Sequence, residues 1–489
     1  MTEKRSEAAA VRRWVASIVV ITAVALVPSR ASAEKVVPLG DGWQIYTDGR
    51  AGAFASWAHG DGFPQPVTEV ITNADGSRTA YSVSLPTDGG FKSVSEQQQI
   101  DPDVPGRNTQ GTINLVRLRS GYISNVFGFG LRGPVTEWTK FTVYLQFWAF
   151  VENDARQKNV INPVDARQGW AKIEGPWGAL TAGRVRALFS RGATDIDTMY
   201  AHRWGVGMPG TIDGRGPTLG QIGFGVLGSG FSSGIIYGTP SIGGLQLDVG
   251  AFDAVILQAT GSWIRTKYPL AQAELTFTRT FRDGWGKVVL FGNGGYQQVY
   301  KDAACTPFVD PETGNTVPCS VTSLGAGYGG RFEFGPFHLG LAGHTGKGLG
   351  LNYALESSDG AQDKQGNLRK ITGWYVQTQV VVKKFDLFAG WGLVQVFLSD
   401  YDNKHTEPDT RPGAPAGARV YPFNVLKTRM GINAGIVYNA TPNLHFDLDF
   451  FRAEADYFDS PNVMISNGAA FPAIKQVVYV TSGGMIINW

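Results

Sequence analysis

Apolar and polar side chains alternate, one residue at a time, in segments that recur along most of this 489-residue chain. The pattern is clearest at residues 141–151, 376–382 and 444–450. A side-chain period of two is typical of β-strands. Only one stretch, near the N-terminus, approaches the apolar length of roughly 18 to 20 residues that a membrane-spanning helix needs. The sequence therefore excludes a bundle of membrane helices and predicts an all-β chain.

The alternation fits a soluble sandwich, whose apolar faces point inward, and also a membrane barrel, whose apolar face points outward to the lipid. The connections between the strands distinguish the two. Short and long connections alternate strictly along the chain, and seven short turns with eight long loops require sixteen antiparallel strands. This is the arrangement of a bacterial outer-membrane barrel, with short periplasmic turns and long extracellular loops. The short turns are at 131–137, 174–177, 240–244, 281–285, 335–337, 383–386 and 440–443; the long loops are near 59–111, 152–168, 186–229, 252–263, 301–320, 343–371, 399–424 and 455–474.

Residues 1–33 have the pattern of a cleaved export signal. Arg12 and Arg13 precede an apolar run over residues 14–27, and the Ala-Ser-Ala sequence at 31–33 provides the small residues that a signal peptidase accepts. We expect cleavage before Glu34, which leaves residues 34–489 as a single transmembrane barrel domain. An uncleaved N-terminal anchor helix is the alternative.

Cys305 and Cys319 are the only two cysteines. Export leads to an oxidising compartment, so we expect them to form a disulfide that holds a loop together. The six histidines are scattered and the cysteines have no zinc-type spacing, so we expect neither a metal nor a cofactor. The formal net charge of +2 lacks the basic excess that is typical of nucleic-acid-binding domains.

Two enzyme-like motifs occur without the structural context that each needs. Residues 230–234 fit G-x-S-x-G, but nothing helical follows them, and residues 223–228 fit G-x-G-x-x-G outside any βαβ unit. A chain with 64 glycines produces both by chance. We therefore expect no enzyme and no catalytic residues.

The last strand carries the most specific single signal. Counting back by twos from the terminal Trp489 gives Ile487 and, further on, Tyr479, in an amphipathic strand that ends on an aromatic residue. This resembles the signature by which the barrel-assembly machinery recognises outer-membrane proteins. The whole mature chain resembles the sixteen-stranded general diffusion porins of Gram-negative bacteria. The local match is the run GRVRALFSRGATD at 183–195, which resembles the porin segment that leaves the fifth strand for the loop inside the pore.

The resemblance implies a homotrimer in the outer-membrane lipids that passes small hydrophilic solutes and ions by passive diffusion. It also implies a third loop folded into the lumen, where its acidic side chains face a basic cluster on the wall and create a transverse field. The acids would be Asp195, Asp197 and Asp213. A basic residue that faces lipid costs about 2–4 kcal/mol, so basic residues on strands should face the lumen. These are Arg50, Arg117, Arg119, Arg184, Arg186, Lys427 and Arg429.

Several alternatives remain open at this stage. The arginines near strand ends would also fit the lipid headgroup level, and the aspartates would also fit an ordinary solvated loop. A carbohydrate-selective porin would show a row of lumenal aromatic residues, for which Tyr46, Phe54, Tyr144, Trp148 and Tyr375 are the candidates. An outer-membrane hydrolase is disfavoured, because such enzymes normally use ten or twelve strands.

Overall fold

A computed structural model provides the fold. It describes residues 34–61, 67–72, 78–83, 112–121, 123, 125–149, 164–198, 221–254, 263–281, 284–301, 305–311, 314, 316–352, 354–355, 361–363, 366–404, 407–408, 417, 419–420, 425–458 and 475–489.

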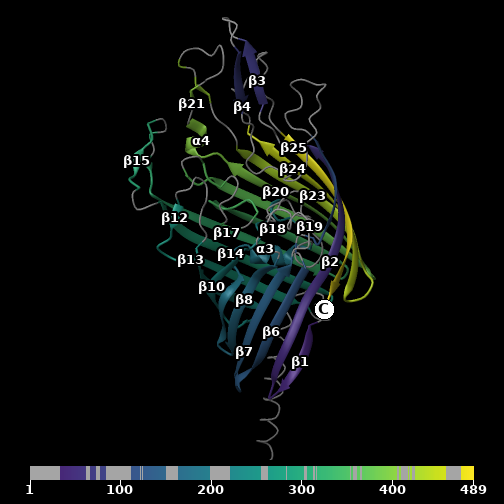
Figure 1. The fold of residues 1–489 in the computed structure, drawn as a ribbon. Helices are drawn as coiled ribbons and strands as arrows, with labels where there is room; N and C mark the ends of the chain where they lie inside the picture. Colours follow the sequence, from purple (N-terminus) through teal and green to yellow (C-terminus); the bar gives the residue numbers. More distant parts are fainter. Residues whose placement is uncertain are drawn as a thin grey trace, which may run out of the picture.

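Sixteen antiparallel strands form a closed barrel (Figure 1). The second strand is made of two segments, because β5 pairs with the later part of β2 and β6 pairs with its earlier part. The ring closes where β25 pairs with β2, with Asn488 opposite Arg50. The predicted sixteen-stranded barrel is thus confirmed. Its strands are β2 (Trp43–Asp61), β5 (Thr112–Arg119) with β6 (Asn125–Thr136), β7 (Thr139–Ala149), β8 (Val164–Gly175), β9 (Gly178–Arg186), β10 (Phe231–Gly238), β11 (Leu245–Phe252), β13 (Leu270–Thr280), β14 (Gly286–Lys301), β17 (Ser320–Phe334), β18 (Phe337–Lys347), β19 (Lys370–Val382), β20 (Phe385–Phe397), β23 (Leu426–Asn439), β24 (Leu444–Tyr457) and β25 (Lys475–Asn488).

Shorter elements extend or decorate the barrel. β1 (Lys35–Gly40) pairs with the start of β2 beyond the point where β25 ends, and β12 (Trp263–Arg265) pairs with β14. The other short elements lie in long connections: the hairpins β3 (Val67–Thr72) with β4 (Arg78–Val83), β15 (Phe308–Val309) with β16 (Thr316–Val317) and β21 (Glu407–Pro408) with β22 (Arg419–Val420), and the helices α3 (Arg191–Ile196) and α4 (Asp400–Lys404). Among the described residues, no helix has the length and hydropathy needed to cross a membrane.

All seven predicted short turns are present, at one end of the barrel that we call the turn end. The first lies at the late edge of its predicted range, because β6 continues to Thr136. Gly335 and Lys383 begin two of the turns with positive φ values of 55° and 53°, which tight hairpin turns require. The long connections join the strands at the opposite loop end, so the turn chemistry in the sequence was sufficient to count the strands.

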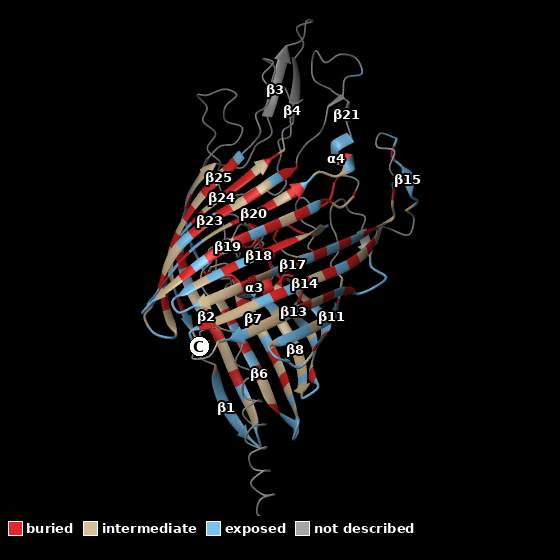
Figure 2. Ribbon diagram, turned by 180° about the vertical axis from the view of Figure 1, so that it is seen from behind, coloured by how far each residue is buried: buried red, intermediate tan, exposed pale blue. Residues whose placement is uncertain are grey.

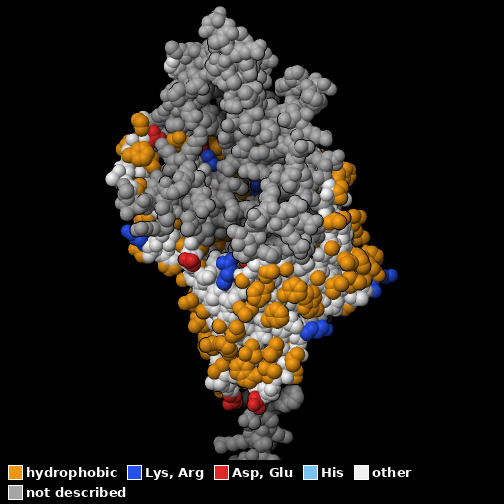
Figure 3. All heavy atoms as spheres, viewed as in Figure 1, with side chains coloured by type: hydrophobic (Ala, Val, Ile, Leu, Met, Phe, Trp, Pro, Cys, Tyr) orange, Lys and Arg blue, Asp and Glu red, His pale blue; other side chains and the backbone are white. Residues whose placement is uncertain are grey.

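The two faces of each strand have opposite polarity, as the alternation predicts. On β24, Leu448 is 56% exposed while its neighbour Asp449 is 2% exposed. Buried and exposed residues alternate along the strands in Figure 2, and an apolar belt covers the barrel surface in Figure 3. Exposed aromatic residues gather near the turn end: Trp138, Trp177, Trp285, Phe337 and Phe385. This combination of an apolar band with an aromatic girdle is typical of a barrel in a bilayer.

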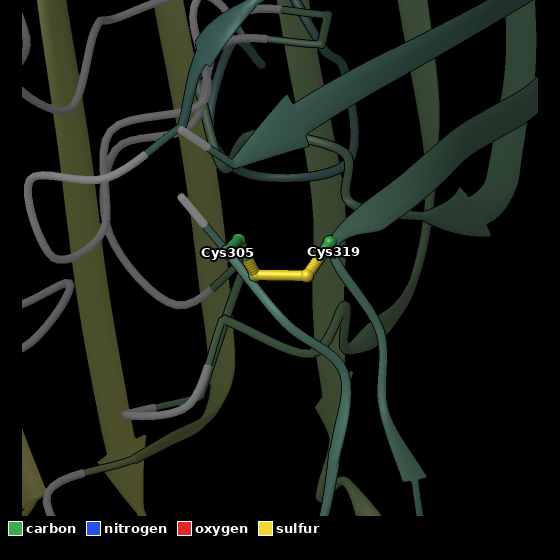
Figure 4. Close-up of a disulfide and its surroundings, with 2 residues drawn as sticks. All are labelled: Cys305 and Cys319. Atoms are coloured by element: carbon green, nitrogen blue, oxygen red, sulfur yellow. A yellow bond between two sulfur atoms is a disulfide. The ribbon is translucent and has the colours of Figure 1, made fainter. Parts of the chain in front are cut away.

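Cys305 and Cys319 form a disulfide across the base of the β15–β16 hairpin, with their Cα atoms 5.8 Å apart (Figure 4). The bridge therefore closes the fifth long loop, which joins β14 to β17.

Replacing both cysteines with serine should loosen this loop and leave transport nearly unchanged. Closing a loop of about 15 residues contributes roughly 3 kcal/mol, and that contribution falls on the hairpin rather than on the barrel. We expect faster proteolysis within residues 305–319 and an unaltered single-channel conductance in a planar bilayer. A large loss of conductance would contradict this and show that the fifth loop shapes the pore.

Candidate functional site: the lumen and its third loop

The third long loop leaves β9 and places α3 against the inner wall of the barrel. The helix packs on lumen-facing side chains of β13, β14, β17 and β18. Gly192 is essential to this approach, because a Cβ at that position would lie 2.3 Å from the Phe291 ring of β14. These four strands are the eighth to the eleventh of the ring, so α3 lies across the lumen from β2.

A polar network fixes the start of α3 to the wall. The Glu274 carboxylate of β13 accepts hydrogen bonds from Arg191 Nε at 2.7 Å, from the Gly192 amide at 2.7 Å and from Asn293 Nδ2 at 2.9 Å. Arg191 also pairs with Asp248 of β11. Burial alone would lower the pKa of Arg191, but the two carboxylates outweigh it and raise that pKa above its ordinary value, so this guanidinium stays charged.

The end of α3 is fixed to β19 in the same way. Asp197 is fully buried and accepts hydrogen bonds from Gln377 Nε2 at 2.8 Å and from the Gln221 amide at 3.0 Å. The Thr198 amide donates to Gln377 Oε1 at 2.9 Å, and the Tyr375 hydroxyl donates to the Ala193 carbonyl at 2.8 Å. The helix is thus held at both ends by side chains of the barrel wall.

The returning part of the loop, residues 221–230, packs against the next strands of the ring. Phe224 is fully buried, its ring packs edge-on against Phe451 of β24, and its carbonyl oxygen lies so close to Gly392 of β20 that a Cβ there would be 1.8 Å away. The Ala187 amide donates to the Gly230 carbonyl at 2.8 Å, which closes the neck of the loop. The described parts of the third loop therefore follow the inner wall from β13 to β24.

The three predicted acids lie in different environments. Asp195 is exposed in the lumen and pairs with Arg186 of β9. Asp197 serves the anchor just described and does not face open space. Asp213 lies outside the described residues.

The predicted basic residues are also placed differently. Arg50 is buried on β2, while Arg184 is exposed and its Nε donates to the Arg167 carbonyl at 3.1 Å. In the strand register, Arg117 lies opposite Ser56 and Arg119 lies opposite Phe54, and both β2 residues are buried on the inner face. The side chains of the two arginines lie outside the described residues.

Lys427 and Arg429 differ in exposure, although they lie two positions apart and a regular strand would place them on one face. β23 has an irregularity between Leu426 and Thr428, which leaves Lys427 without a register partner and exposed. Arg429 lies beyond it, is 1% exposed and donates to Asn352 Oδ1 at 2.8 Å. A bulge adds one residue and so reverses the alternation on which the prediction of a shared face depended.

Sequence reasoning missed the ion pairs on the inner wall of β6 to β8. Arg167 Nε lies 2.9 Å from Asp165, and Lys172 Nζ lies 2.6 Å from Glu174. Arg132 of β6 lies 3.0 Å from Glu34, near the turn end. The pairs on β8 each join residues i and i+2, a spacing that the sequence does display and that places both charges on one strand face.

The lumenal aromatic residues do not form an open stacking row. Tyr46, Phe54, Tyr144, Trp148 and Tyr375 are each less than a tenth exposed. Two of them, Tyr46 and Tyr144, stack on each other with ring centroids 6.0 Å apart. The row of accessible rings that a sugar track needs is thus not provided by these five. The described residues also contain no group of histidines, cysteines and carboxylates that could hold a metal.

A barrel of sixteen strands with an apolar outer belt, polar inner wall and loop inside the lumen defines an outer-membrane channel. The family model of the Gram-negative porins matches residues 21–470 of the chain. The chain therefore belongs to the Gram-negative porin family, and its function is passive diffusion through the barrel.

One solved structure supports the same fold, and two others are similar at a lower level. The outer membrane channel DcaP of Acinetobacter baumannii is 12% identical, with a TM-score of 0.55 over 92% of this chain and 98% of that one. The anion-selective porin from Comamonas acidovorans is 11% identical, with a TM-score of 0.48 over 91% of this chain and all of that one. A trimer form of OmpT from Vibrio cholerae is 12% identical, with a TM-score of 0.44 over 92% and 100% of the two chains. No curated protein matches the sequence.

Proposed function

We propose that residues 1–33 are an export signal that is cleaved off. The mature porin then works as a non-enzymatic homotrimer in the outer membrane, with its turn end in the periplasm. Small hydrophilic solutes and ions pass by diffusion. Trimer formation would cover part of the apolar belt on each barrel. Light scattering on gently solubilised protein tests the assembly, and a stable monomer under those conditions would count against it.

The third loop is the constriction in this proposal. The observation that carries it is the double anchorage of α3, by Glu274 at its start and by Gln377 at its end, which holds a loop helix inside the lumen. Asp195 and Arg186 remain as charges on its accessible side. They would orient dipolar solutes in a narrow passage, where low-dielectric walls strengthen the field.

Neutralising these two charges separately should change ion selectivity in opposite directions. Asp195→Asn leaves Arg186 unopposed and should shift the reversal potential toward anions, whereas Arg186→Gln should shift it toward cations. Raising the salt should shrink both shifts, because the screening length falls from about 10 Å at 0.1 M to about 3 Å at 1 M. The measurement is the reversal potential across a planar bilayer under a salt gradient.

Asp41→Asn is the matched control. Asp41 is an exposed aspartate in the turn between β1 and β2, with a positive φ of 48° that asparagine also tolerates. The Asp41→Asn variant removes the same charge at a position away from α3 and should shift the reversal potential much less. Equal shifts for Asp41→Asn and Asp195→Asn would mean that the net charge, and not the constriction, sets selectivity.

A further inference from the structure

The sixth long loop, residues 348–369 between β18 and β19, does not behave as a solvated surface loop. Three of its described leucines, Leu349, Leu351 and Leu355, are fully buried. They belong to one apolar cluster with Phe189 and Phe224 of the third loop. Burying such side chains is favourable only where they have apolar partners, and this cluster draws them from the third loop and from the barrel wall.

Asn352 joins the sixth loop to the third loop and to the wall. Its carbonyl accepts a hydrogen bond from the Gly228 amide at 2.7 Å, and the Ala354 amide donates to the Gly228 carbonyl at 3.0 Å. Its side-chain Oδ1 accepts from Arg429 Nη1 of β23 at 2.8 Å. Asn352 is 3% exposed, so these bonds are shielded from water.

A second set of contacts fixes the sixth loop from the other side. Arg369 donates to both carboxylate oxygens of Asp402 in α4, at 2.7 and 2.8 Å, and both side chains are buried. The Ser399 hydroxyl donates to Asp363 Oδ2 at 2.7 Å. A bidentate arginine–carboxylate pair fixes geometry as well as adding energy. The sixth loop is therefore held between the seventh loop and the third.

The described parts of the two loops cover the β19–β24 side of the lumen. Lumen-facing groups on β19 and β23, such as Gln377 and Asn433, are 1% exposed beneath them. On the other side, the side chains of the Arg167–Asp165 pair are 25% and 35% exposed, and those of the Lys172–Glu174 pair are 29% each. Among the described parts of the wall, the inner face of β8 is thus more accessible than those of β19 and β23.

We propose that solutes cross along the β8–β9 side of the lumen, and that Asn352 is a positioning residue whose side chain, through Arg429, holds the sixth loop and with it the third over the β19–β24 side. This inference rests on the porin function and adds a second loop to its constriction. The accessible side is lined by ion pairs and by the Gln146 and Gln168 amides, which hydrogen-bond to each other at 3.0 Å.

Cysteine accessibility in an open channel tests the path. In a Cys305→Ser, Cys319→Ser background, Gln168→Cys and Asn433→Cys each place one thiol at a lumen-facing position. A small cationic methanethiosulfonate reagent, added during planar-bilayer recording, should reduce the current of Gln168→Cys and leave that of Asn433→Cys unchanged. Each variant is compared with its own current before the reagent is added.

The role of Asn352 is tested in the Asn433→Cys channel. Adding Asn352→Ala should raise the rate of modification by about tenfold or more, because the loop pair opens locally. Asn352→Asp keeps an acceptor for Arg429 and should retain the protection. Heat-modifiable migration on gels, which reports a folded barrel, is checked for every variant.

Different results would contradict the proposed path, the role of Asn352 and the porin function. Equal reactivity of Gln168→Cys and Asn433→Cys, or protection of Gln168→Cys alone, would overturn the proposed path. An unchanged rate in the Asn352→Ala channel would overturn the positioning role. A folded parent protein that carries no current would instead contradict the porin function itself.

Discussion

Glu274→Ala should free the third loop from the barrel wall and convert a steady open-channel current into one that moves between several levels. The variant removes the acceptor of three hydrogen bonds and leaves Arg191 with Asp248 as its remaining carboxylate partner at this anchor. Breaking a buried ion pair by removing one partner costs about 3–5 kcal/mol. This loss of stability should affect the attachment of the loop and not the barrel, because the backbone hydrogen bonds around the barrel are unaltered.

Single-channel recording and limited proteolysis measure this effect together. We expect added current levels, and cleavage within the third loop that the parent protein resists. Glu333→Ala is the matched control, since Glu333 is also a strand glutamate paired with an arginine, Arg331 of the same strand at 2.8 Å. If both variants give the same steady current as the parent, the Glu274 anchor does not hold the loop.

The barrel could be predicted from the sequence because its rules are local. A period of two places each side chain on one face, and turn residues such as those at Gly335 and Lys383 mark where a strand reverses. Counting turns then gives the number of strands. The same logic placed Leu448 outside and Asp449 inside without any knowledge of neighbouring strands.

The interior could not be predicted in the same way, because its contacts join residues far apart in the chain. Asp197 is an anchor and not an exposed pore acid because Gln377, 180 residues away, donates to it. Lys427 is exposed because of a bulge that no residue type announces. Leu351 of the sixth loop is buried in an apolar cluster that also contains Phe224 of the third loop and residues of the wall, and a loop sequence alone does not reveal such partners.

Trp489→Ala should sharply reduce the amount of folded barrel in the outer membrane. This change alters two features together, the packing of the Trp489 ring and the aromatic end of the last strand. Trp489 exchanges two backbone hydrogen bonds with Gly49 at 2.9 and 3.1 Å, and its ring lies over Gly49, where a Cβ would be 2.5 Å from the ring. It therefore packs at the seam between the last and first strands, and it also ends the strand that resembles the assembly signature.

Comparison of membrane assembly with refolding separates these two features. Gly49→Ala disturbs the packing at the seam but keeps the C-terminal strand intact, while Trp489→Phe keeps a terminal aromatic residue. If Trp489 acts as a signal, Trp489→Ala should lower the folded protein in the membrane several-fold or more and still refold in detergent, whereas Gly49→Ala should assemble with a lower Tm. Trp489→Phe should assemble like the parent. If Trp489→Ala fails equally in detergent and in cells, its part in the seam explains the loss, and the signal role is wrong.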